Sequence, residues 1–421
     1  MKNKIISKRY YRIIFKNVSA LSLGNGNNNN SDKDLMVNSF GEPYIPATSL
    51  AGVYRSLLSD NVADKYFGYI KKVNEDNHEA EMSDSQLLVY DAELYEGNPV
   101  VTIRDGVKLD EFKTAIDGSK YDYEILEPGC SFITYVEQNK FSDSENIFDA
   151  IINYMRNGNF LVGAKTSRGM GSIEIIDVKV KEFEMTRESL EKWLDFDMFN
   201  DNHWNDGLTE ISDASLDDNY LSISINLKQD SMLSIKEYRT DISGKTESMP
   251  DQQQMTYRNG KAVISGTSWN GMFLHALRKY GCNDTDNLFG NTETKSKIYF
   301  SESIVENAKF KIVSRNSIDR FSGGTKDKAL FTEKSCYGGN TVLTIRLPEY
   351  TGKYVKEYDG LCMALADLSE GILALGGETS IGHGIFKVES ISINDKEICG
   401  KGLNGSAIYN ALHCELFKEA Q

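Results

Sequence analysis

A glycine-rich segment, GAKTSRGMGS, holds the residue types best suited to binding a phosphate. Its glycines let the backbone approach an anion closely and direct N–H groups at it, and its polar side chains add donors. The candidate contacts are Gly163, Lys165, Ser167, Arg168, Gly169 and Gly171. Contacts of this kind position a nucleic-acid strand without reading its sequence. The alternative is a tight turn that only leads into a strand.

A second segment, GGETSIGHGI, repeats this pattern near the C-terminus. Glu378 and Ile381 stand where the first segment has Lys165 and Arg168, so we expect weaker binding, or binding mainly through the backbone. An acid–base role for His383, which lies inside the segment, is an alternative. The candidate contacts are Gly376, Gly377, Ser380, Gly382 and Gly384.

Two serines precede segments whose apolar residues recur every three or four positions. Ser49 precedes LAGVYRSLLSD, and Ser268 precedes WNGMFLHALRKYG. The pattern predicts a helix capped by each serine. A helix N-terminus exposes N–H groups that attract anions, which makes both serines candidate contacts. The alternative is an ordinary cap.

The histidines and cysteines argue against a structural metal site. The five histidines show no HxxxH spacing, and none of the six cysteines forms a CxxC pair. We therefore expect reduced, mostly buried thiols rather than a zinc site or a disulfide framework.

The sequence repeats itself in the same order. The two glycine-rich segments match at an offset of 213 residues. Two further pairs are FKNVSALSL (15–23) with LKQDSMLSI (227–235), and EPYIPATSLAGVYRSLL (42–58) with KAVISGTSWNGMFLHAL (261–277). A period this long indicates two similar domains in tandem rather than a solenoid.

Each copy follows one predicted order of elements. An alternating strand (10–18 and 221–229) precedes the serine-initiated helix, and short strands and a long insertion follow. A second helix (145–158 and 358–371) leads through the glycine turn into a last strand. This order predicts an α+β fold with helices on one face of an antiparallel sheet, as in the ferredoxin-like (RRM-like) arrangement.

A linker and a tail lie outside the two copies. Residues 187–218 contain ten acidic and two basic residues with two tryptophans interleaved, so we expect part of this linker to pack on a neighbouring surface. Residues 401–421 predict a helical tail. The expected modules are therefore residues 1–186 and 219–400.

The length and the net charge limit the kinds of protein that this chain can be. The 421 residues fit two or three domains, and a net charge of −15 argues against broad nucleic-acid affinity, although a local basic groove can coexist with it. No run approaches the ~18 apolar residues of a membrane span. The N-terminus lacks the features of a signal peptide, so we expect a cytoplasmic protein with no membrane partner.

Together these motifs resemble the RAMP superfamily, the repeat-associated proteins of CRISPR effector complexes. The resemblance rests on PYIPATSLAG with its echo AVISGTSWNG, on both glycine-rich segments, and on residues 314–345, which resemble the family's thumb hairpin. It implies two tandem RAMP domains, each with an inserted thumb hairpin. Two fused modules resemble the double-module backbone subunits of type III-D-like complexes.

The resemblance implies a subunit that binds guide CRISPR RNA and, with other type III effector subunits, complementary target RNA. Lys16 and Arg55 would line an RNA groove together with the first glycine-rich segment. The family's basic residue after the helix-opening serine is missing, because Ala51 and Asn270 stand there, and Leu274 replaces Arg55 in the second copy.

The resemblance also implies a catalytic aspartate in the loop before the Ile-Pro stretch. Asp32 aligns with Asp251 at an offset of 219, whereas Asp34 aligns with Gln253, so Asp32 and Asp251 are the candidates and Asp34 the reserve. Such a carboxylate would orient or deprotonate the attacking 2′-hydroxyl, or hold a Mg²⁺ ion near it. The alternative is a solvated loop aspartate.

The thumb segments would wedge between nucleotides and strain one phosphodiester for attack. Apolar wedge candidates are Val107 and Leu109 in the first copy, and Ile318 and Phe321 in the second. The alternative is that these residues form the core of the hairpins themselves.

The leading hypothesis is a metal-dependent endoribonuclease that acts only within the assembled ribonucleoprotein. Three other functions stay open: a structural backbone subunit without cleavage, a guide-processing endoribonuclease of the same superfamily, and an unrelated acidic metabolic enzyme. The small number of histidines disfavours the guide-processing enzyme.

Overall fold

The structure is a computed structural model that describes residues 4–26, 28, 31–72, 80–110, 114–237, 250–291 and 293–418. Its chain divides into two compact units, each with its own sheet and core. The first unit comprises Met1–Ile103, Asp122–Thr166 and Met170–Asp218. The second unit comprises Arg104–Tyr121, Ser167–Gly169 and Asn219–Gln421.

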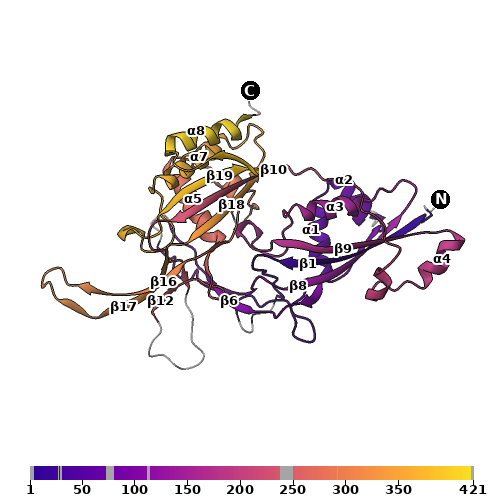
Figure 1. Ribbon diagram of the computed structural model, residues 1–421, viewed down its shortest axis with the longest axis horizontal. Helices are drawn as coiled ribbons and strands as arrows, with labels where there is room; N and C mark the ends of the chain where they lie inside the picture. The colour runs from indigo at the N-terminus through magenta and orange to yellow at the C-terminus, as the bar shows by residue number, and fades with distance from the viewer. Residues whose placement is uncertain are drawn as a thin grey trace. The chain divides into compact units, whose positions relative to one another are not determined.

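An antiparallel sheet in the order β4–β8–β1–β9 forms the base of the first unit (Figure 1). The helices α1 (Ala47–Ser56) and α3 (Ile147–Arg156) pack apolar side chains onto one face of it. The helix α2 (Asp60–Phe67) follows α1, and β5 (Glu93–Glu96) pairs with β8. The strands of the sheet are β1 (Ser7–Asn17), β4 (Leu87–Val89), β8 (Ser131–Lys140) and β9 (Ile173–Glu184).

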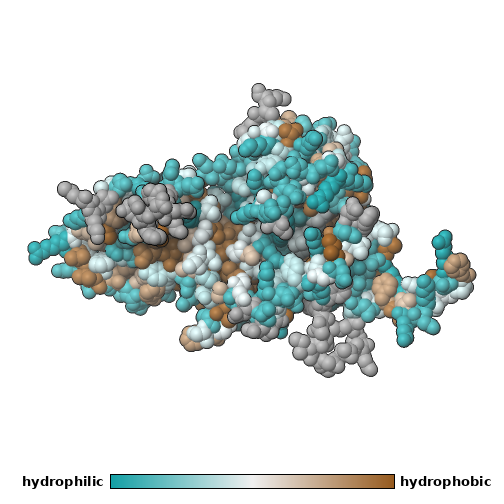
Figure 2. Space-filling view, turned by 180° about the vertical axis from the view of Figure 1, so that it is seen from behind, coloured by the Kyte–Doolittle hydropathy of each residue, from teal (hydrophilic) through white to brown (hydrophobic). Residues whose placement is uncertain are grey.

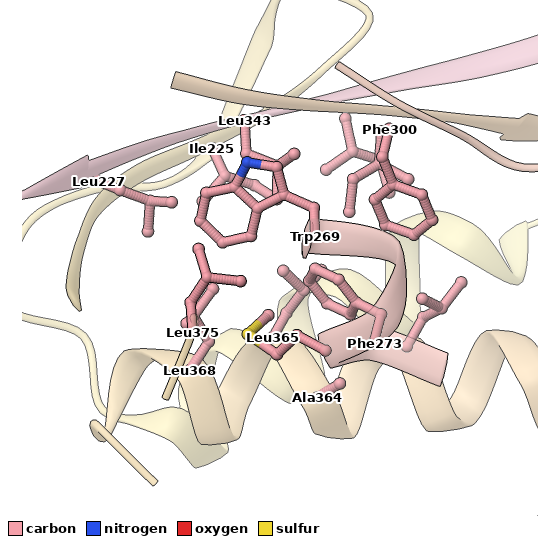
Figure 3. Packing of buried hydrophobic residues seen from close by; sticks show 14 of the residues in the cluster. Ile225, Leu227, Trp269, Phe273, Phe300, Leu343, Ala364, Leu365, Leu368 and Leu375 are labelled. Atoms are coloured by element: carbon pink, nitrogen blue, oxygen red, sulfur yellow. The ribbon is translucent and has the colours of Figure 1, made fainter. Parts of the chain in front are cut away.

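A similar sheet, in the order β14–β18–β10–β19–β20, forms the base of the second unit. Its strands are β10 (Tyr220–Gln229), β14 (Tyr299–Phe300), β18 (Asn340–Pro348), β19 (Phe386–Ile393) and β20 (Lys396–Cys399). The helices are α5 (Gly266–Lys279), α6 (Asp286–Phe289), α7 (Val355–Ser369) and α8 (Gly405–Leu416). Figure 3 shows the fully buried Trp269 of α5 lying between Leu343 of the sheet and Leu368 of α7.

The two sheets share their strand order and an irregularity. In each, the first strand lies between the third and the fourth strands of a βαββαβ unit, which is the ferredoxin-like order. The pairing of the first strand with the last shifts register after Ile14 in β1 and after Asn226 in β10, 212 residues further on. The expected α+β class is confirmed.

Hairpins and short strand pairs complete the units. The strands β16 and β17 form the long ribbon that projects from the second unit in Figure 1. The short strand β12 pairs with β17 in parallel and with β11 in antiparallel. The bounds are β2 (Tyr69–Lys72), β3 (Ala80–Ser83), β6 (Val101–Gly106), β7 (Tyr121–Leu126), β11 (Lys236–Glu237), β12 (Gln252–Gln254), β13 (Ala262–Ile264), β15 (Ser303–Val305), β16 (Lys309–Ile318) and β17 (Thr325–Tyr337).

The prediction that Ser49 and Ser268 cap their helices is wrong, because both helices begin earlier. The cap of α5 is Ser265, whose hydroxyl accepts the N–H of Ser268. The cap residue of α1 is Pro46, and the N–H of the first helical residue donates to the carboxylate of Asp91. Each predicted serine therefore lies within the first turn of its helix.

The acidic linker packs on the first unit, as expected. It contains the helix α4 (Arg187–Leu194) and a 3₁₀ turn (Asp201–Trp204). Trp204 is fully buried in a cluster with Tyr10, Tyr135 and Phe183, which alternate with core residues along their strands. The linker thus covers the sheet face opposite the helices. Among the described residues, no helix has the length and apolarity needed to cross a membrane.

Candidate nucleic-acid interface

The two glycine-rich segments have the same backbone geometry. Lys165 and Glu378 stand at equivalent positions, and both adopt a left-handed conformation, with φ of 57° and 58°. A Cβ added to Gly171 or to Gly384 would lie 2.0 or 1.9 Å from a carbonyl oxygen of the preceding segment. These two glycines are therefore required by a close approach of the chain to itself.

Several amides of these segments are engaged within the protein. The N–H groups of Gly171, Gly377, Gly382 and Gly384 all donate to backbone carbonyls, at 2.7–3.1 Å. Those four donors do not point at an external anion, which shifts the expected contacts toward side chains. Within these two segments, the predicted contacts that lie exposed are Gly163, Gly376, Ser380 and Gly382.

In the first unit, the loop aspartate and the segment lysine meet at the strand β7. The N–H of Asp122 donates to Oδ2 of Asp32 at 2.9 Å, and the N–H of Asp32 donates to Oδ1 of Asp122 at 2.7 Å. The next residue of β7, Tyr123, holds the ammonium of Lys165 3.4 Å from its ring centroid. Two side chains predicted from separate motifs, Asp32 and Lys165, are thereby brought to one strand.

In the second unit, Asp251 is held in the same way at the strand β17. The N–H of Thr332 donates to Oδ2 of Asp251 at 2.6 Å, and the hydroxyl of Thr332 bonds to both the carboxylate and the N–H of Asp251. Both aspartates are exposed. Asp34, the reserve candidate, is buried and accepts the N–H of Ser31 at 2.9 Å, which makes it a loop-shaping residue.

A charged cluster joins the second glycine-rich segment to the β16–β17 hairpin. Arg315 of β16 donates to Glu378 at 2.9 Å, and its other terminal nitrogen lies 3.3 Å from Nε2 of His383. The same guanidinium lies 4.0 Å from Glu333 of β17, which is 1% exposed. Because His383 is also buried, it is not placed to exchange protons with an RNA at the surface.

Sequence reasoning missed Asp122, Thr332, Arg315 and Glu333. Asp122 and Thr332 are separated by 210 residues, close to the repeat offset, so aligning the hairpin strands residue by residue could have found them. Arg315 and Glu333 come together only through pairing of β16 with β17. A linear pattern gives no sign of that contact.

Two of the other predicted cations, Arg55 and Arg168, have partners within the protein. Arg55 donates to Asp64 and to the carbonyls of Ala63 and Gly68, which ties α1 to the end of α2. The guanidinium of Arg168 donates to the carbonyl of Phe289 at 3.4 Å, and burial lowers its pKa below the ordinary value.

The remaining predicted contacts lie on regular elements. Lys16 is exposed on β1, opposite Ser131 of β8. Ser49 and Ser268 lie half-buried in the first turns of α1 and α5. Ser167 and Gly169, also half-buried, lie in or beside the 3₁₀ turn of the first glycine-rich segment.

The apolar hairpin residues do not form a core. Val107 is 46% exposed, Leu109 50%, Ile318 66% and Phe321 97%. Figure 2 shows apolar side chains among hydrophilic ones at the far end of the β16–β17 hairpin. Side chains in such positions are free to contact a partner.

Metal ligands are sparse in the described part of the chain, where no group of three or more His, Cys, Asp or Glu residues is placed to hold an ion. The carboxylates of Asp32 and Asp122 each accept the backbone N–H of the other residue, and Mg²⁺ is commonly held by one or two carboxylates together with substrate phosphates. Asp251 has a threonine in place of the second carboxylate.

Comparison with known proteins gives one family. No curated protein matches the chain. Among solved structures, a chain of the cryo-EM structure of the type III-B Cmr-beta bound to cognate target RNA matches with 13% identity and a TM-score of 0.32. That match covers 42% of this chain and 61% of the other, less than two thirds of its length. The family model of the RAMP superfamily matches residues 14–174 and 243–387, which is more than half of the chain. The protein therefore belongs to the RAMP superfamily.

Proposed function

We propose that the protein is a guide-RNA-binding backbone subunit of a type III CRISPR effector, built from two tandem modules that each place a loop aspartate to cleave complementary target RNA. The observation that carries this proposal is that Asp32 and Asp251 make the same hydrogen bond to a strand. Each accepts, through Oδ2, a backbone N–H from the second strand of a hairpin, β7 or β17. The double-module form favours a type III-D-like complex.

The proposed chemistry needs only an exposed carboxylate held at a fixed place. Asp32 or Asp251 would orient the target's 2′-hydroxyl for attack on the adjacent phosphate. Asp32 and Asp122 together would hold a Mg²⁺ ion, whose charge would stabilise the anionic transition state. The exposed hairpin residues Ile318 and Phe321 would displace a base and bring the phosphodiester into line.

Contacts to the RNA backbone would come from a few cations rather than from the overall charge. In the first unit, Lys165 lies over Tyr123, and the residue before it on β7, Asp122, binds Asp32. A phosphate bound to Lys165 would therefore lie near the carboxylate of Asp32. A local field of this kind can act within a protein of net charge −15.

A second candidate is a subunit with the same RNA contacts and no cleavage. The hydrogen bonds of the two aspartates favour it, because anchoring the loop through a backbone N–H is by itself a sufficient role for such a residue. Guide processing is disfavoured, because the one histidine of the glycine-rich segments is buried against Arg315.

The test uses the assembled complex with guide RNA and a labelled complementary target. Asp32→Ala and Asp251→Ala should each remove one cleavage product, and the double variant should remove both. Asp60→Ala, an exposed aspartate of α2, is the matched control and should leave every product in place. If the double variant still yields both products while guide RNA is bound, the silent-backbone candidate replaces the cleaving one.

A further inference from the structure

In the second unit, the cations beside the glycine-rich segment come from other elements. Arg315 of β16 donates to Oε2 of Glu378 at 2.9 Å, and Nζ of Lys236 of β11 lies 3.5 Å from Oε1 of the same carboxylate. Glu378 stands where the first segment has Lys165, with the same left-handed backbone. The second segment thus has a carboxylate, Glu378, in place of the lysine, and this carboxylate binds two cations from other elements.

This cluster is layered by exposure. The side chains of Arg315 and Lys236 are 23% and 32% exposed. Beneath them, Glu333 and His383 are 1% and 5% exposed. Among the residues that the structure describes, Oε2 of Glu333 and Nδ1 of His383 are buried and find no hydrogen-bond partner. The two cations and Glu378 (22% exposed) reach solvent, whereas Glu333 and His383 do not.

The cluster occupies the same place as the lysine contact of the first unit. Tyr123 follows the residue that holds Asp32, and Glu333 follows the residue that holds Asp251. Lys165 lies over Tyr123, and Arg315 lies beside Glu333. In each unit, a positive charge therefore lies beside the strand residue that follows the one bound to the loop aspartate.

We propose that Arg315 and Lys236 form the RNA-backbone contact of the second module, with Glu378 as the residue that positions them. The proposal rests on the proposed function and extends it to two residues that the sequence analysis did not assign as RNA contacts. A guanidinium matches two oxygens of a phosphodiester, and a neighbouring ammonium adds a second charge. The expected ligand is single-stranded RNA bound through its phosphates, without preference for sequence.

The test measures binding of the full chain to a fluorescein-labelled single-stranded RNA of mixed sequence, by anisotropy over a range of salt concentrations. Arg315→Ala and Lys236→Ala should each weaken binding about tenfold and lower the salt slope by about 0.7. Lys279→Ala, which removes an exposed charge at the end of α5, is the control and should change neither.

A charge relocation separates this role from a structural one. Glu378→Lys places a lysine where the first segment has Lys165, so the double variant Arg315→Ala/Glu378→Lys should bind within about twofold of the parent protein. Failure of this rescue would overturn the proposal, and so would an Arg315→Ala variant that binds like the control. If the parent chain binds no RNA, the proposed function itself is wrong.

Discussion

The backbone N–H of Asp122 donates a 2.9 Å hydrogen bond to Oδ2 of Asp32, and the N–H of Asp32 returns a bond to the carboxylate of Asp122. The loop is thereby fixed to β7 at the candidate catalytic residue. Asp32→Asn keeps an acceptor oxygen and loses the charge, whereas Asp32→Ala loses both. We expect the free energy of unfolding to fall by about 1 kcal/mol in Asp32→Ala and to stay unchanged in Asp32→Asn.

Target cleavage separates the two roles of this aspartate. Under the proposed function, both variants should lose the product assigned to the first module, because the proposed reaction needs the carboxylate. Urea unfolding and the cleavage assay, run on the same preparations, measure the two effects. Cleavage retained by Asp32→Asn would leave Asp32 only an anchoring role.

The glycines of the two segments should differ in their tolerance of alanine. Gly171→Ala and Gly384→Ala would each drive a Cβ to within 2.0 Å of a backbone carbonyl oxygen. Gly382, with φ of 87° and open space around it, serves as the matched control. Its alanine variant should cost about 1–2 kcal/mol from the left-handed backbone alone.

The first two variants should cost more, because the chain must also move. Chemical denaturation of the three variants gives the order. Equal losses at all three positions would contradict the steric argument.

The packing of the linker predicts that Trp204 stabilises the first unit. Trp204 is fully buried and donates its indole N–H to the carbonyl of Met198 at 2.9 Å. Trp204→Ala should lower the stability of this unit by about 3–5 kcal/mol. Leu194→Ala, at a position of α4 that is 68% exposed, should change it by less than about 0.5 kcal/mol.

Hydrogen exchange of peptides from β1 and β8 measures this effect within the first unit. Faster exchange in Trp204→Ala, with peptides of β10 and β18 unchanged, is the expected result. Unchanged exchange in β1 would show that the linker contributes no stability to the sheet that it covers.

The reactivity of the cysteines should show which thiols are buried in the folded protein. All six cysteines lie within the described residues and are free thiols, and Cys414 is the exposed one. Burial raises the pKa of Cys336 and of Cys362 to about 12, so both stay protonated and unreactive at pH 8. Titration with a thiol reagent at pH 8 should modify one thiol per native chain, and none in Cys414→Ser. Rapid modification of several thiols in the folded protein would contradict the burial.

The hairpin tip should matter for RNA and not for folding. Phe321 is 97% exposed, so Phe321→Ala should leave the melting temperature within about 1 °C of the parent value. Under the proposed function, the same variant should slow target cleavage by the second module. Lys326→Ala, on the same hairpin, is the control for a change of surface charge. A cleavage rate equal to that of the control would remove Phe321 from the mechanism.

The strands and helices could be predicted because their periodicity is local. The alternation in β1 and β10 and the apolar spacing in α3 and α7 appear in consecutive residues. The first residue of α1 was predicted less well, because Asp91, which accepts the N–H of that residue, lies 44 residues further along the chain.

The candidate site was predictable where the two units have the same residue at matching positions and not where they differ. Asp32 and Asp251 align by offset, and the structure gives them the same hydrogen bond. Arg315 lies in the thumb-like segment but could not be assigned a contact, because its position depends on the pairing of two long strands and on an ion pair to Glu378. Such contacts combine residues that are distant in the chain and different in type.

The shared backbone of the two glycine-rich segments has a consequence for protein engineering. Each loop is held at both ends by the chain's own carbonyls, through bonds that do not involve the side chain at position 165 or 378. Residues 163–172 and 376–385 thus share the left-handed backbone at this position while carrying opposite charges there. Exchanging only the side chains at positions 165 and 378 would therefore alter the local charge and leave these backbone bonds in place, so one backbone path can carry either charge.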